Sequence, residues 1–434
     1  MRLSDIATVP LRARAVRAPT LRLLLLKERM QSGIAVDPFA RAFRDNPYPA
    51  LHEVRERDPT HWLETGQAWL FTRHDDVSAL LRDRRCSNDR TPSAYSVDAA
   101  WRRDSRFQRV MEHSVLGLDA PDHTRLRSLV GKAFTPRVVA QMQSRIVELT
   151  DELLDRVTAQ GEFEVMRDLA QPLPVQVIAE LLGAPAEDHE RFGRWAAALG
   201  DALDLTFDRR TLERADQAVA EMRAYFRPLI EERRDSRDDL LSALAAAEEQ
   251  GDQLSEEELY AFCVLLLAAG SQTTTHAIGN SLLALLQDRE ALNGFRDRGE
   301  SVESAIEELL RYDSPVQFTS RRALESMELN GKRIRPGDLL VLSLGAANRD
   351  PEQFANPDRL DLARTDNRHV AFGLGSHYCM GAPLARLELS VALPRVLERF
   401  PSIQLDAGVR HAWLDTLVLR GLKTLPVRPL NGSA

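Results

Sequence analysis

The chain has 434 residues, of which 44% are hydrophobic and 28% are charged, a composition typical of a globular protein and not of a disordered or fibrous one. Its formal net charge of −8 argues against bulk nucleic-acid binding. The cysteines Cys86, Cys263 and Cys379 lie far apart, so the sequence predicts neither a disulfide framework nor a cysteine metal cluster. Unpaired thiols fit the reducing cytoplasm, where we expect the protein to be located.

The N-terminal segment is rich in arginine and leucine, which faintly resembles a targeting peptide. Pro10 and Pro19 interrupt it, and no apolar run in the chain is long enough for a membrane span. We therefore expect residues 1–34 to form a surface extension and residues 35–434 to form a single domain.

The first part of this domain predicts short mixed elements. A helix is expected over residues 48–57, followed by a hairpin of strands 61–64 and 68–72 and a helix over 74–82. Residues 86–105 are polar and irregular, so they predict a long loop, which is either functional or simply solvated.

Helical patterns dominate the middle of the chain. Amphipathic periodicity predicts four helices, over residues 136–161, 169–183, 186–203 and 210–233. Ser255 and Glu258 form a capping box that begins a longer helix, and residues 259–269 are apolar on all sides, so this helix should cross the core. Its centre, Ala-Gly-Ser-Gln-Thr-Thr-Thr over residues 269–275, is poor helix-forming sequence and by itself indicates a structural kink.

The last third of the chain mixes helices with short strands. Glu308 and Arg311 share one face of a helix predicted over residues 302–311, and alone they would be an ordinary surface pair. Strands are expected over 327–329, 332–334 and 339–343, and a helix over 382–400. The predicted fold is mainly α with a smaller β-rich region.

One loop near the C-terminus carries the clearest chemical signal. Gly373 and Gly375 allow positive φ, and Pro383 suits the first turn of the helix that follows Cys379. Amides and the positive dipole end at a helix N-terminus stabilise a thiolate, so Cys379 would be a metal ligand or a nucleophile. The default for a lone cysteine is a buried, inert side chain, which would need no such glycine-rich loop.

The segment 372–386 resembles the haem-binding signature of the cytochrome P450 family. The fixed positions that it fills are Phe372, Gly373, Gly375, His377, Cys379, Gly381, Leu384, Ala385 and Arg386. The resemblance extends over about residues 37–430 and implies the cytochrome P450 fold, with haem b between the long central helix and the helix after the cysteine loop. It implies that Cys379 is the axial thiolate ligand of the haem iron.

The same resemblance implies roles for residues elsewhere in the chain. The expected propionate-binding residues are His123, Arg127, Arg321 and His377. Further haem contacts are expected from Phe372, Gly373, Gly381, Ala269 and Gly270. A buried structural network is expected from Glu308, Arg311 and Arg359, and a substrate pocket from Ser93, Val97, Val316, Phe318 and Leu417.

The central helix departs from the family pattern at one position. Residues 269–275 resemble the oxygen-activation motif, so Thr273 and Gln272 are the expected catalytic pair: Thr273 would supply the hydroxyl, and Gln272 takes the place of the usual carboxylate. An amide forms hydrogen bonds but does not carry a proton by changing its charge. Two enzymatic hypotheses follow: a monooxygenase that uses dioxygen, and a peroxide-using or substrate-assisted enzyme that couples rings or rearranges bonds. A non-catalytic docking module is a third, which the presence of Cys379 and Thr273 disfavours.

The leading hypothesis is hydroxylation or epoxidation of a medium-sized apolar molecule, such as a polyketide, peptide or terpenoid precursor. The sequence has no cysteine quartet and no dinucleotide fingerprint, so electrons should come from a separate acidic ferredoxin or flavodoxin with an NAD(P)H reductase. Arg125, Lys132 and Arg364 are expected to supply positive charge for its docking. We expect a monomer.

Overall fold

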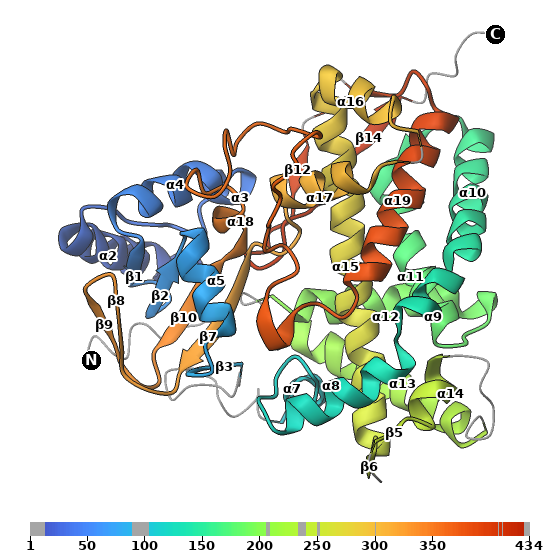
Figure 1. Ribbon diagram of the computed structural model, residues 1–434, viewed down its shortest axis with the longest axis horizontal. Helices are drawn as coiled ribbons and strands as arrows, with labels where there is room; N and C mark the ends of the chain where they lie inside the picture. Colours follow the sequence, from blue (N-terminus) through green and yellow to red (C-terminus); the bar gives the residue numbers. More distant parts are fainter. Residues whose placement is uncertain are drawn as a thin grey trace.

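The computed structural model describes residues 14–88, 104–204, 209–232, 240–249, 252–299, 301–406, 408–409 and 411–428. A large helical region lies beside a smaller region built around a five-stranded sheet (Figure 1), which confirms the predicted fold class. The helices are α2 (Arg14–Ser32), α3 (Arg41–Asp45), α4 (Tyr48–Arg57), α5 (His74–Arg82), α7 (Arg106–Glu112), α8 (Asp122–Ala133), α9 (Pro136–Gln141), α10 (Gln143–Gln160), the π-helix η1 (Met166–Ala170), α11 (Pro172–Leu181), the 3-10 helix η2 (Ala186–Asp188), α12 (His189–Ala202), α13 (Arg209–Glu232), α14 (Leu240–Ala245), α15 (Glu256–Gln287), α16 (Arg289–Arg296), α17 (Glu303–Tyr312), α18 (Leu344–Ala347), the 3-10 helix η3 (Gly375–His377) and α19 (Ala382–Arg399). The strands are β1 (Thr60–Leu63), β2 (Ala68–Phe71), β3 (Cys86–Ser87), β4 (Phe163–Glu164), β5 (Glu248–Glu249), β6 (Asp252–Gln253), β7 (Phe318–Ala323), β8 (Met327–Leu329), β9 (Lys332–Ile334), β10 (Leu339–Ser343), β11 (Gln404–Leu405), β12 (Ala412–Trp413), β13 (Leu422–Thr424) and β14 (Pro426–Arg428).

The five-stranded sheet joins distant parts of the chain. Its strand order is β1-β2-β10-β7-β3, in which β1 and β2 form the predicted hairpin. Strand β10 runs parallel to β2 and antiparallel to β7. Buried apolar side chains on β2, β10 and α5, including Phe71, Leu342 and Val77, form a core under the sheet. The sheet region thereby carries β7 to the edge of the helical region, where β7 contributes to the site described below.

Helix α15 forms the centre of the helical region. Ser255 and Glu258 make both hydrogen bonds of the predicted capping box, which fixes the first residue of the helix. Helix α15 packs against α11, α12 and α19, and Figure 1 shows it running the length of this region. Among the described residues, α15 alone has the length and apolar composition of a membrane span, but 72% of its apolar window is buried inside the protein. The apolar composition and the burial of α15 together are typical of the core helix of a globular protein.

Two predicted helices are interrupted where the sequence pattern alone suggested continuity. The helix expected over residues 136–161 is split into α9 and α10, with Met142 between them. The helix expected over 169–183 begins as the π-helix η1, and regular α geometry starts only at Pro172. Proline has no backbone N–H and cannot donate a hydrogen bond to the preceding turn. The change from π-helix to α-helix therefore occurs at Pro172, where one backbone hydrogen bond would be missing in any case.

The described part of residues 1–34 packs against the domain, unlike the surface extension expected from sequence. The Glu28 carboxylate of α2 is 1% exposed and accepts hydrogen bonds from the N–H groups of Val36 and Glu64 at 2.7 and 2.9 Å. The same carboxylate lies 3.0 Å from His61 Nε2. A domain boundary at residue 34 therefore does not match the packing of α2; residues 1–13 lie outside the described residues.

Candidate active site

A cavity of about 340 Å³ lies between α15 and the cysteine loop. Its volume is within the usual range for small-molecule sites, and its wall is mostly apolar, including Phe262, Leu266 and Leu419. The predicted site residues that line it are Arg127, Ala269, Gly270, Thr273, Val316, Phe318, Arg321, Phe372, Gly373, His377, Cys379 and Gly381. The fold thus brings most of the predicted residues, from four separate segments, to one cavity.

The cysteine loop is held in shape by its glycines. Gly373 and Gly375 have φ values of +68° and +74°, in the left-handed region that favours glycine. A Cβ atom on Gly375 would also lie 2.9 Å from the Leu81 carbonyl oxygen, so this position excludes side chains for two reasons. The Cys379 N–H donates to the Phe372 carbonyl at 3.0 Å and closes the loop. These contacts direct Cys379 to the cavity wall.

The environment of the Cys379 sulfur contains opposing influences. Burial raises the pKa of the Cys379 thiol, whereas hydrogen bonds from the Gly381 and Ala382 amides, and the charges of Arg127 and Arg386, act to lower it. The net shift is upward, so the helix N-terminus predicted to stabilise a thiolate does not by itself offset burial. The side chain is nevertheless accessible from the cavity that it lines.

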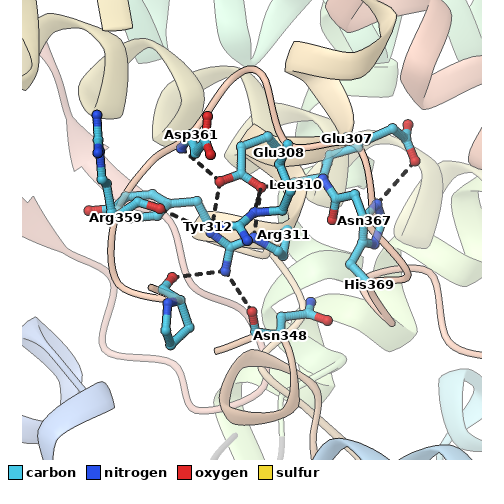
Figure 2. A network of polar contacts seen from close by, with 12 residues as sticks. Glu307, Glu308, Leu310, Arg311, Tyr312, Asn348, Arg359, Asp361, Asn367 and His369 are labelled. Atoms are coloured by element: carbon cyan, nitrogen blue, oxygen red, sulfur yellow. Dashed lines mark hydrogen bonds and ion pairs between the residues drawn. The ribbon is translucent and has the colours of Figure 1, made fainter. Parts of the chain in front are cut away.

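A carboxylate beneath the loop anchors it to α17. Glu307 accepts hydrogen bonds from Arg386 at 2.6 and 2.7 Å. It also lies 3.1 Å from His369 Nε2 (Figure 2). Burial alone would raise the pKa of Glu307, but the hydrogen bonds from Arg386 and His369 lower it to about 2. Arg386 also lies over the Phe372 ring, 4.5 Å from its centroid. The Glu307–Arg386 ion pair thereby contacts the start of the cysteine loop through His369 and Phe372, and its end through Arg386 itself.

The predicted propionate-binding residues form one cluster. The ring centroids of His123 and His377 lie 3.9 Å apart with the ring planes tilted by 33°, and the Nε2 atom of His123 is buried without a hydrogen-bond partner. Burial lowers the pKa of both histidines, that of His377 to about 3, where the charges of nearby Arg321 and Arg127 also contribute. Arg127 donates to the Tyr378 carbonyl at 2.6 Å. The cluster places two permanent positive charges and an unpaired buried nitrogen together, a donor set that suits a carboxylate.

The central segment of α15 presents its hydroxyl groups to the cavity without breaking the helix. Thr273 Oγ1 donates to the Ala269 carbonyl at 2.8 Å, and Thr274 Oγ1 donates to the Gly270 carbonyl at 3.1 Å. A Cβ atom on Gly270 would lie 3.1 Å from Ile178 Cδ1, so this glycine also allows α11 to pack closely against α15. Both threonines line the cavity, and α15 is continuous through them.

Gln272 does not line the cavity, although the sequence placed it in the catalytic pair with Thr273. Its Nε2 atom donates a long hydrogen bond of 3.4 Å to the Ala196 carbonyl of α12. Its side chain covers Gly200 of α12, where an added Cβ would lie only 2.4 Å from Gln272 Cγ. Gln272 therefore fastens α15 to α12 in this structure.

The residues predicted to form the substrate pocket divide into three groups. Val316 and Phe318 line the cavity as predicted. Leu417 does not line it; this residue borders a separate cavity of about 20 Å³, because Asp204 accepts a hydrogen bond from the Leu417 N–H at 2.7 Å and fixes the loop there. Ser93 and Val97 lie outside the described residues.

The predicted Glu308–Arg311 pair forms a fully buried network. Arg311 donates to Glu308 at 2.7 and 2.8 Å and to the carbonyls of Asn348 and Pro357 at 2.7 and 2.9 Å (Figure 2). The third side chain is Arg364, whose Nε lies 3.0 Å from Glu308 Oε2. The network joins α17 to the segment that leads into the cysteine loop.

Arg359 was predicted as the third member of this network, and that prediction is wrong for its side chain. Only the Arg359 carbonyl contributes, by accepting from Arg311 at 3.3 Å. Its guanidinium points away from the network (Figure 2), is 69% exposed and lies 4.0 Å from Glu290.

The three cations expected to dock a redox partner are not equivalent. The Arg364 side chain is only 8% exposed and is committed to Glu308, so its predicted docking role is wrong. Arg125 is half-buried and paired with Glu258 and Asp252. Lys132 is exposed at the end of α8. A docking surface made of all three residues is therefore inconsistent with the structure.

Sequence reasoning missed Glu388, an acid on the cavity wall. This residue of α19 is 1% exposed, and its Oε2 atom has no hydrogen-bond partner. Burial raises the pKa of Glu388 well above its usual value. The signal was present in the sequence, since Glu388 falls one turn after Leu384 on the buried stripe of α19.

Replacing Glu388 by glutamine is expected to stabilise the protein increasingly as the pH rises from 5 to 8. A raised folded pKa means that unfolding favours loss of the proton, so wild-type stability falls above the unfolded pKa of about 4.3. Glutamine has no such proton to lose. Thermal unfolding of the haem-loaded proteins across this pH range measures the difference. Glu398→Gln, an exposed change on the same helix, is the control, and a pH-independent effect of Glu388→Gln would contradict the burial of a neutral carboxyl.

The sequence profile described as Cytochrome P450 matches residues 51–297 and 300–411 of the chain. The chain belongs to the cytochrome P450 family. The polyketide biosynthesis cytochrome P450 PksS of Bacillus subtilis is 40% identical over 399 residues, which cover 90% of this chain and 97% of PksS. The vitamin D(3) 25-hydroxylase of Pseudonocardia autotrophica is 39% identical, covering 90% and 96% of the two chains.

Solved cytochrome P450 structures share the same architecture. The Bacillus subtilis PksS structure matches with a TM-score of 0.83 and 39% identity, covering 91% of this chain and 100% of PksS. P450BioI, solved in complex with an acyl carrier protein ligated to hexadec-9Z-enoic acid, matches with a TM-score of 0.82 and 38% identity, covering 89% and 99%. The predicted family, fold and enzyme class are thereby confirmed: the protein is a cytochrome P450 monooxygenase, and this family binds haem iron through a cysteine thiolate.

Proposed function

We propose that this cytochrome P450 inserts one oxygen atom from dioxygen into a C–H or C=C bond of a medium-sized apolar molecule, such as a polyketide, peptide or terpenoid precursor. The observation that carries this proposal is that Cys379 and Thr273 open onto the same mostly apolar cavity. An apolar wall selects substrates by shape and burial and offers few polar groups to orient them. The polyketide role in the name of PksS supports a secondary-metabolite substrate.

Cys379 would hold the iron of haem b through its sulfur. Gly381 and Ala382 supply amide hydrogen bonds to the sulfur, and a coordinated cation keeps a thiol deprotonated even where burial opposes this. When bound, the haem iron supplies the activation of dioxygen that amino-acid side chains lack. Arg127 and Arg321 would neutralise the propionates, and the unpaired His123 Nε2 would gain a hydrogen-bond partner.

Thr273 is the proposed proton-holding residue of the cavity. Its Oγ1 hydrogen is donated to the Ala269 carbonyl at 2.8 Å, and rotation about the Cα–Cβ bond would turn the same hydrogen toward a group in the cavity. Ala269 and Gly270 leave free space in the cavity beside Thr273, because neither carries a side chain beyond Cβ. The mostly apolar wall would limit the amount of water beside this hydroxyl.

A second candidate function is favoured by the orientation of Gln272. Its amide is bound to the Ala196 carbonyl, so the position that usually carries the family's acid provides no titratable group at the cavity. A substrate that supplies its own proton donor, or an oxidant such as peroxide that arrives already protonated, would remove the need for that acid. This favours ring coupling or rearrangement as the alternative chemistry.

A comparison of oxidants tests the two candidates. Apolar natural products, free or attached to a carrier protein, are first screened for the haem absorbance shift caused by substrate binding. Bound compounds are then incubated with dioxygen, NAD(P)H, a reductase and a ferredoxin or flavodoxin, or with peroxide alone. We expect product containing one atom of labelled dioxygen in the first mixture. Product from peroxide alone, or product without labelled oxygen, would replace the leading candidate by the second.

A further inference from the structure

Helix α2 is held against the sheet by its inner face. Glu28, on that face, is 1% exposed and binds the N–H groups of Val36 and Glu64 as well as the ring of His61. Figure 1 shows α2 at the end of the molecule occupied by β1 and α4, far from α10 and α19. These contacts fix the rotation of α2 about its own axis, and therefore determine which of its residues face away from the protein.

The outer face of α2 is apolar. Leu23, Leu26 and Met30 are 64%, 55% and 80% exposed. Their spacing of three and four residues places them on one stripe of the helix. In the described parts of the chain, the other large hydrophobic side chains with comparable exposure are Leu324 and Val409, so most of this exposed apolar surface is gathered on α2.

Basic side chains border this stripe on both sides. At about 100° per residue, Arg22 and Arg29 fall along one border and Lys27 along the other. Arg22 and Arg29 are exposed, and Lys27 remains 52% exposed while paired with Glu64. Glu28 is the one acid in the sequence of α2, and it faces inward. The outer face of α2 is thus positive, on a protein whose net charge is −8.

We propose that α2 binds the surface of an anionic phospholipid membrane, with Leu23, Leu26 and Met30 inserted among the acyl chains. A helix in the plane of the interface needs an apolar stripe and basic residues whose long side chains reach the headgroups, and α2 has both. A stable protein partner would usually require about 20–30 residues on each side of an interface, far more than this stripe provides. The proposal concerns where the enzyme is located and is independent of its substrate.

Vesicle sedimentation of the full-length, haem-loaded protein tests the proposal. Vesicles of phosphatidylcholine with phosphatidylglycerol are expected to retain the protein at least tenfold better than vesicles of phosphatidylcholine alone. The triple variant Leu23→Ser, Leu26→Ser, Met30→Ser is expected to lose this retention, and Arg22→Glu with Arg29→Glu to weaken it. Leu324→Ser, an equally exposed apolar change elsewhere, is expected to have no effect.

Folding is checked by the thiolate-haem spectrum, which these exposed changes should leave unaltered. Equal retention by both vesicle types, or full retention of the triple variant, would overturn the proposal. So would loss of retention in Leu324→Ser. If the wild type fails to bind vesicles but forms dimers that the triple variant abolishes, then the stripe covers a second copy of this chain instead of a membrane.

Discussion

Cys379→Ser is expected to abolish turnover and the red-shifted Soret band of the reduced, carbon-monoxide-bound protein. Serine preserves the size of the side chain and leaves the glycine-shaped loop intact, but its hydroxyl is a far poorer anionic ligand than a thiol. The change isolates the chemistry of one atom, because the Cys379 N–H bond to the Phe372 carbonyl does not depend on the side chain. Absorption spectra and product formation measure the two effects.

The other two cysteines provide the controls. Cys86 and Cys263 are buried in β3 and α15, and neither lines the cavity. Cys86→Ala and Cys263→Ala are therefore expected to lower stability modestly and to keep both the Soret band and the activity. A Cys379→Ser protein that retains the thiolate band, or a Cys86→Ala protein that loses it, would contradict the proposed ligand.

Glu308→Ala is expected to destabilise the fold by about 3–5 kcal/mol, since it leaves the buried guanidiniums of Arg311 and Arg364 without their carboxylate. Urea unfolding of the haem-loaded proteins measures the loss. Arg364→Ala, which leaves the Glu308–Arg311 pair in place, is expected to cost less. Arg359→Ala is expected to change stability by no more than about 0.5 kcal/mol, because only its carbonyl takes part.

The matched control is an ion pair of the same kind at the surface. Arg209 and Glu213 lie four residues apart on α13, with side chains 75% and 59% exposed, and Glu213→Ala is expected to cost at most about 0.5 kcal/mol. If Glu308→Ala does not fold, the loss of stability in Arg364→Ala compared with that in Arg359→Ala still tests which arginine side chain belongs to the network. Equal losses in those two variants would contradict the assignment of Arg364 as the third side chain.

Local patterns were sufficient for much of the fold and for one side of the site. The capping box at Ser255, the hairpin at β1 and β2 and the glycines around Cys379 each depend on neighbours in sequence, so they could be predicted. The clustering of His123 with His377 followed from a family resemblance. No local pattern would have brought these two residues together, because they come from α8 and η3.

The errors arise where contacts are non-local or where a side chain's direction decides its role. Arg359 was chosen by motif, but a backbone carbonyl takes that place and Arg364 reaches the carboxylate instead. Leu417 was misplaced because Asp204, distant in sequence, holds its loop. The position of Gln272 could not be inferred from helical spacing, since Gln272 and Thr273 follow Ala269 by three and four residues and both lie near its face. The contact with Ala196 of α12, distant in sequence, turns the Gln272 side chain away from the cavity.

The contact between Gln272 and α12 restricts which substitutions this protein can accept. A carboxylate at position 272 would face the Ala196 carbonyl, and two acceptors repel each other, so restoring the family's acid would break the hold on α12. Gly200 in turn admits no side chain beneath Gln272. Positions 272 and 200 are therefore mutually dependent, and a single change to an acid at position 272 is expected to weaken the contact between α15 and α12.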